Sequence, residues 1–153
     1  MEPWHALSKQ DLLMNPLQEF FYQKENIEQI KSILDGNSLI SLRIIDWFVT
    51  NYSKKNFTSY LVDDKRFVVH TEYKLKLRSY KKKRFDPFCR WDRINLPYKN
   101  GTFIQTTIGQ LNFFKWALEN EVITYIESNY KNIENDMNKR NSSSRKKNNN
   151  KNI

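Results

Sequence analysis

The stretch Tyr60-Leu-Val-Asp-Asp-Lys-Arg-Phe-Val-Val-His-Thr-Glu-Tyr-Lys-Leu-Lys-Leu77 is where the helical spacing of apolar residues gives way to alternation. Apolar residues on every second position predict a long strand over 67–77. Asp63-Asp64 predicts the turn that joins this strand to a short preceding one. A helix over 71–83 is the alternative, because several aromatic and aliphatic residues there also fit helical spacing. We favour a β-hairpin around 58–77.

Helical spacing dominates the sequence on both sides of this hairpin. It predicts helices at 16–22, 27–34 and 39–54 before the hairpin and at 107–118 and 122–137 after it. Thr107 to Gln110 has the spacing of a capping box at the start of the fourth helix. Asn100-Gly101 predicts a second turn, between short strands around 93–106. The expected fold class is α+β, with one small antiparallel sheet flanked by N-terminal and C-terminal helices.

Positive charge is concentrated in two segments of the 153 residues, whose net charge is +9. Residues 65–99 contain 12 basic and 3 acidic residues, and residues 139–153 contain 6 basic and none acidic. The rest of the chain is acidic, with 8 basic and 14 acidic residues. A compositional drift toward lysine would spread the charge evenly, so this separation favours a dedicated surface for an anionic partner.

The composition also limits the class of protein. A hydrophobic content of 39% is enough for one folded domain, which we place at 1–138. Residues 139–153 have no apolar residue before the last, so we expect a disordered basic tail. The single cysteine excludes an intramolecular disulfide framework. Without an apolar run near the roughly 18 residues of a membrane span, or the pattern of a signal peptide, we expect a non-secreted protein in a reducing setting.

The segment 81–93, Lys-Lys-Lys-Arg-Phe-Asp-Pro-Phe-Cys-Arg-Trp-Asp-Arg, interleaves cations with aromatic residues. Lysine and arginine neutralise phosphates, and exposed aromatic rings stack on unpaired bases. The predicted nucleic-acid-binding residues are Lys81, Lys82, Lys83, Arg84, Phe88, Arg90, Trp91, Arg93, Arg145, Lys146 and Lys147. The alternative is that Phe85, Phe88 and Trp91 anchor the core while the cations form a solvated face. The segment does not distinguish DNA from RNA.

A second pattern indicates an enzyme. Many metal-dependent nucleases hold Mg²⁺ with an aspartate and a Glu-x-Lys triplet on adjacent strands, and Asp63 or Asp64 with Glu72 and Lys74 supplies these residue types. Glu-x-Lys triplets are common in a chain this rich in charge, and Asp63-Asp64 is more simply a turn. We therefore assign no catalytic residue, no metal site and no cofactor.

Three segments carry a resemblance to a known family: Ser41 to Lys55, Lys83 to Arg90, and Thr107 to Trp116. In these segments the chain resembles small uncharacterised proteins of nucleocytoplasmic large DNA viruses, the giant viruses. The resemblance covers about 40–130 and leaves the first 38 residues and the tail outside. It implies a viral protein of the host cytoplasm, in a viral factory, or of the virion, and it transfers no catalytic residue.

The leading hypothesis is a non-enzymatic nucleic-acid-binding protein. Packaging of this protein with a viral genome is one form of that hypothesis. The second is a structural or assembly protein of a virion, in which acidic flanks meet the basic middle of another copy or of a viral partner. The third is the Mg²⁺-dependent nuclease.

Overall fold

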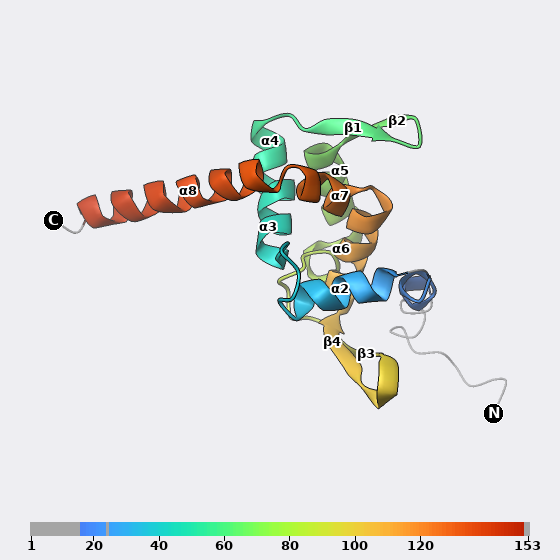
Figure 1. Ribbon diagram of the computed structural model, residues 1–153. Helices are drawn as coiled ribbons and strands as arrows, with labels where there is room; N and C mark the ends of the chain where they lie inside the picture. The colour runs from blue at the N-terminus through green and yellow to red at the C-terminus, as the bar shows by residue number, and fades with distance from the viewer. Residues whose placement is uncertain (1–15, 24, 152–153) are drawn as a thin grey trace, which may run out of the picture.

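The computed structural model describes residues 16–23 and 25–151, with side chains to residue 142 (Figure 1). Helical residues 16–21 come first. The elements after them are α2 (Asn26–Leu34), α3 (Leu42–Trp47), a π-helical turn (Phe48–Tyr52), α4 (Ser53–Lys55), β1 (Ser59–Val62), β2 (Lys65–Val68), α5 (Val69–Tyr80), a 3₁₀ turn (Lys82–Arg84), β3 (Arg93–Pro97), a second 3₁₀ turn (Lys99–Gly101), β4 (Phe103–Thr107), α6 (Ile108–Glu119), α7 (Val122–Ser128) and α8 (Tyr130–Lys151). The α+β class is confirmed. Residues 1–15 of the predicted domain lie outside the described residues.

The predicted long second strand is wrong, because β2 ends at Val68 and α5 begins at Val69. In an alternating apolar pattern, apolar residues also recur at every fourth position, which is a helical spacing. Val69 and Tyr73 therefore fit both a strand and a helix. The helix buries these two residues and leaves Leu75, which a strand would bury, 50% exposed. The alternative helical interpretation therefore describes α5 better.

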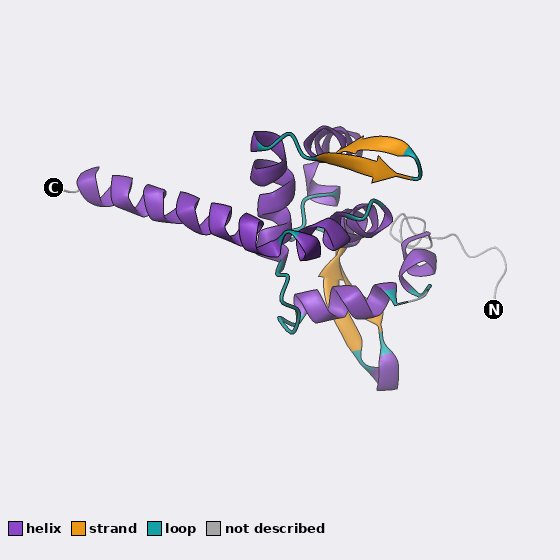
Figure 2. Cartoon of the chain, turned by 45° about the horizontal axis from the view of Figure 1, so that its top comes forward, coloured by secondary structure: helices purple, strands orange, loops and turns teal. Residues whose placement is uncertain are grey.

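The described part of the chain contains two separate two-stranded antiparallel sheets instead of one. In the first, Val62 pairs with Lys65 across a two-residue turn in which Asp63 and Asp64 both have positive φ. The second joins β3 to β4, with Arg93 opposite Thr107. Figures 1 and 2 show the two hairpins at opposite ends of the molecule, with helices between them.

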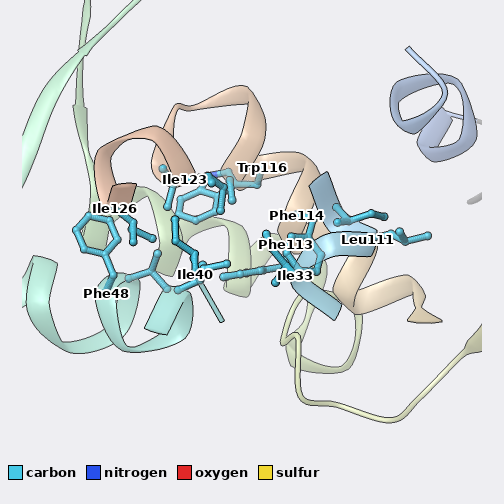
Figure 3. Packing of buried hydrophobic residues seen from close by; sticks show 14 of the residues in the cluster. Ile33, Ile40, Phe48, Leu111, Phe113, Phe114, Trp116, Ile123 and Ile126 are labelled. Atoms are coloured by element: carbon cyan, nitrogen blue, oxygen red, sulfur yellow. The ribbon is translucent and has the colours of Figure 1, made fainter. Parts of the chain in front are cut away.

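The centre of the core is α6, which is buried over most of its circumference (Figure 3). Its buried side chains include Leu111, Phe113, Phe114 and Trp116. These side chains pack with residues of α2, α3, the π-helical turn and α7, among them Ile33, Phe48, Ile123 and Ile126. The burial of so many aromatic rings on one helix makes α6 the support on which the surface segments are held.

The last predicted helix is broken at Asn129, which ends α7 and donates a side-chain hydrogen bond to the Tyr125 carbonyl oxygen (3.0 Å). In α8, Ile133 is buried, and the helix contacts α3 before it leaves the body of the molecule. Figures 1 and 2 show its C-terminal half projecting away. The predicted disorder of the tail differs from the structure, which is helical to Lys151. Extending a helix that is already nucleated adds a hydrogen bond for each residue ordered.

Candidate nucleic-acid interface

The segment between α5 and β3 is fixed to the core by Phe85. This side chain is fully buried, and its ring centroid lies 5.7 Å from that of Phe113 and 5.8 Å from that of Trp116. For Phe85 the core-anchor interpretation is therefore correct. The cations on either side of Phe85 are presented on a loop with a buried centre.

The first turns of α6 hold the backbone of this loop. Asn112 donates to the Arg84 carbonyl oxygen (2.8 Å), and Gln110 donates to the Pro87 carbonyl oxygen (2.9 Å). Thr107 caps the helix as predicted, by accepting from the Gln110 N–H (3.1 Å). The Gln110 side chain serves the loop instead of completing the capping box. The sequence pattern was right about the helix start but did not show this contact with the loop.

The Arg84 side chain contacts another residue of the same loop. It is only partly exposed, and its Nε lies 3.7 Å from an Asp92 carboxylate oxygen. The Asp92 carbonyl oxygen in turn accepts from the Ile108 N–H (3.1 Å) at the start of α6. The predicted binding residue Arg84 therefore has an ion-pair partner inside the protein, at a separation too long for a hydrogen bond.

The remaining predicted residues of the loop are exposed. Phe88 is 53% and Trp91 57% exposed, and the Lys83 ammonium lies 5.0 Å from the centroid of the Trp91 ring. Asp86 accepts from the Phe88 N–H (2.9 Å), which fixes the backbone where the ring emerges. Within the part of the chain that the structure describes, none of the exposed cations here forms an ion pair with a carboxylate. We call this set the basic loop face: Lys81, Lys82, Lys83, Phe88, Arg90, Trp91 and Arg93.

Arg145, Lys146 and Lys147 lie in the half of α8 that projects from the body. The structure does not bring them onto the basic loop face. They form a separate basic extension on a helical backbone.

Sequence reasoning missed a third group of cations, where α4 meets α8. A groove of about 640 Å³ there is lined by Trp47, Asn51, Lys54, Lys55, Phe57, Asp136, Lys139 and Arg140. Lys54 and Lys55 belong to a region whose total charge is acidic, so counting by segment concealed them. Their position next to Lys139 and Arg140 comes only from the packing of α8 against α3.

The residues of the predicted nuclease do not lie on adjacent strands. Glu72 and Lys74 are in α5, where residues two apart point in different directions. Asp63 and Asp64 form the turn between β1 and β2. Asp63 and Glu72 line one cavity of about 570 Å³, but Lys74 is not among its lining residues. Among the described residues, no group of three His, Cys, Asp or Glu side chains is placed to hold a metal ion. The geometric premise of the nuclease was wrong.

A half-buried carboxylate lies behind the loop. Burial, together with the negative charge of Asp86, raises the pKa of Asp46 to about 6. Asp86 belongs to the loop and Asp46 to α3, and the negative charge of Asp86 disfavours ionisation of Asp46.

No helix in the described ranges combines the length and the apolar character that crossing a lipid bilayer requires. Together, the fold and the surface define a small α+β protein. It presents a loop that is anchored to α6 and carries exposed aromatic side chains and cations without ion-pair partners in the described part of the chain.

The chain belongs to the family of unknown function DUF7197, which it matches over residues 4–153. It is similar to "Uncharacterized protein L507" of Acanthamoeba polyphaga mimivirus, with 48% identity over 114 residues. That alignment covers 69% of this chain and 44% of the relative, so the chain spans less than half of the relative's length. No solved structure is significantly similar to it. The predicted relationship to giant-virus proteins is confirmed. The family match extends beyond the segment of about 40–130 that carried the resemblance, to residues 4–153.

Proposed function

We propose that this protein is a non-enzymatic nucleic-acid-binding protein that contacts DNA or RNA through the basic loop face. The observation that carries the proposal is the exposure of Phe88 and Trp91 among unpaired cations, on a loop whose backbone is held by α6. Exposed aromatic side chains cost solvation free energy, and their position beside lysine and arginine matches surfaces on which bases stack while phosphates are neutralised.

The fixed backbone of the loop adds to this argument. The contacts of Phe85, Gln110 and Asn112 order the loop before any ligand arrives, so little conformational entropy is lost on binding. The exposed cations supply most of the affinity through counterion release, and this contribution depends little on sequence. We expect salt-sensitive binding with weak base selectivity.

The basic half of α8 adds a helical cationic arm to this surface. An arm of this kind strengthens binding to any polyanion without adding selectivity. For a protein related to one from a giant virus, the corresponding setting is the host cytoplasm, where a viral factory forms, or the virion, where the protein would be packaged with the genome.

The test is a fluorescence-anisotropy titration of labelled single-stranded and duplex DNA and RNA at several salt concentrations. We expect Phe88→Ala combined with Trp91→Ala to weaken single-strand binding by at least about 25-fold, because two stacked bases contribute roughly 1–3 kcal/mol each. The matched control is Phe103→Ala, since Phe103 is 61% exposed on β4 outside the basic loop face.

An equal effect of the loop variant and the control would contradict the proposal. Strong self-association of a protein that does not bind nucleic acid would favour the assembly hypothesis. Light scattering of the same samples measures it.

A further inference from the structure

Phe57 is the most exposed large hydrophobic residue in the described part of the chain. Its side chain is 86% exposed, and its backbone has φ of +51° in the turn between α4 and β1. A left-handed backbone is unfavourable for a bulky side chain, and glycine would occupy the position without strain. Burial does not offset this cost at Phe57. The combination of strain and exposure makes Phe57 a candidate functional residue.

The surroundings of Phe57 are cationic and aromatic. It lines the groove of about 640 Å³ between α3–α4 and α8, together with Trp47, Lys54, Lys139 and Arg140. Lys139 and Arg140 come from α8, and the others come from a helical segment more than 80 residues earlier in the chain. The groove therefore forms only in the folded protein.

The acidic residue that lines the groove, Asp136, already accepts hydrogen bonds from groups of the protein. Asp136 accepts from Lys55 Nζ (2.9 Å) and from the Trp47 indole N–H (2.9 Å). Burial raises the pKa of Asp136, but these two hydrogen bonds and the positive charges of Lys55 and Lys139 together outweigh it and hold the pKa below its usual value. In the described part of the chain no carboxylate forms an ion pair with Lys54, Lys139 or Arg140. Four cations and one carboxylate line the groove, so it offers an anion a net charge of +3.

We propose that this groove is a second nucleic-acid contact, in which an unpaired base stacks on Phe57 while the neighbouring phosphates lie against Lys54, Lys139 and Arg140. The inference rests on the proposed function and extends it to single strands. Charge complementarity selects a polyanion, and the exposed ring selects one that carries flat apolar faces.

Single-strand preference follows from the geometry of stacking. The bases of a duplex cover one another's faces, so a base reaches Phe57 only after it is unstacked, which costs free energy. A duplex would use the three cations and leave the ring unused. The contribution of Phe57 should therefore appear in single-strand binding and be absent from duplex binding.

The experiment uses the full chain and compares Phe57→Ala, Phe57→Gly and Phe103→Ala with the wild type. Anisotropy titrations measure affinity for an oligothymidylate of about 20 nucleotides, longer than the roughly 4–16 nucleotides of many single-strand sites, and for a duplex of equal length. Urea unfolding of each variant measures stability. Because glycine favours a positive φ, Phe57→Gly should unfold at no lower urea concentration than Phe57→Ala.

We expect both substitutions of Phe57 to weaken oligothymidylate binding by roughly 5- to 150-fold and to leave duplex binding within about twofold. Phe103→Ala should leave both affinities unchanged. Equal losses for single strand and duplex, no difference between Phe57→Ala and Phe103→Ala, or loss only of self-association would overturn the inference while the proposed function stands. A wild-type protein that binds neither nucleic acid would overturn both.

Discussion

Gly109 in α6 lies so close to the backbone of Asp86 that a β-carbon at position 109 would be 3.0 Å from the Asp86 carbonyl oxygen. It would also be 3.1 Å from the carbonyl oxygen of Lys83. Both contacts are with backbone atoms of the basic loop, which cannot rotate away as a flexible side chain would. The absence of a side chain at Gly109 is what allows the loop to rest on α6.

Gly109→Ala should therefore displace the loop. We expect a loss of about 1–3 kcal/mol in the free energy of unfolding, as for other overpacking substitutions, together with weaker nucleic-acid binding. The control is Gly36→Ala, where φ is +78° and no atom lies within 4 Å of the added β-carbon. That substitution should lower stability by about 1 kcal/mol through backbone strain and leave affinity unchanged. Urea unfolding and anisotropy titration measure the two quantities, and unaltered binding by Gly109→Ala would show that the loop does not depend on this contact.

Replacement by methionine should change stability at Arg84 and the salt dependence of binding at Lys82. Arg84→Met leaves the partly buried Asp92 carboxylate without its cation, so we expect a loss of about 1–3 kcal/mol in stability. The exposed Lys82 has no such partner in the described part of the chain, and Lys82→Met should leave stability within about 0.5 kcal/mol. The salt dependence of binding should fall for Lys82→Met and stay at the wild-type value for folded Arg84→Met. The reverse pattern would make Arg84 the phosphate contact.

The contribution of Asp46 to the free energy of unfolding should fall as pH rises. Its pKa of about 6 in the folded protein exceeds the model-peptide value of 3.8, mainly because burial disfavours the charged carboxylate and also because Asp86 is nearby. The folded protein therefore binds this proton more tightly, and the contribution is lost as pH rises from about 4 to about 6. Asp46→Asn removes the titration. Its free energy of unfolding relative to the wild type should rise by about 1–2 kcal/mol over that interval, after allowance for solvent screening. Urea unfolding at several pH values measures the difference, and a constant difference would contradict it.

Much of the fold could be predicted because apolar spacing and turn residues act locally. The helix that became α2, the cap at Thr107 and the turn at Asn100-Gly101 follow from such signals. The boundary between β2 and α5 could not be predicted in this way. The decisive fact there is that Tyr73 packs on Phe113 and Trp116 while Leu75 remains exposed, and this depends on residues about 40 positions away.

The candidate site, too, could be predicted only where the signal is local in the sequence. Composition located the cations of the basic loop face, but only packing shows that Phe85 is buried and that Arg84 pairs with Asp92. The groove at α4 and α8 was not predictable, because Lys54 and Arg140 are far apart in the chain and the tail was expected to lack helical structure. A segment count of charge detects clusters in sequence and misses those formed by tertiary contact.

The most direct test of the central claim is the salt dependence of nucleic-acid affinity for two charge-matched triple variants. One replaces Lys81, Lys82 and Lys83 by alanine, and the other replaces the exposed Lys65, Lys74 and Lys131. Both remove three charges, so net charge alone would affect them equally. We predict that the slope of log affinity against log salt concentration falls by about 2–3 for the loop variant, from roughly 0.7–0.9 for each lost phosphate contact, and changes little for the other. Equal slopes for the two variants, or no wild-type binding even at low salt, would contradict the account.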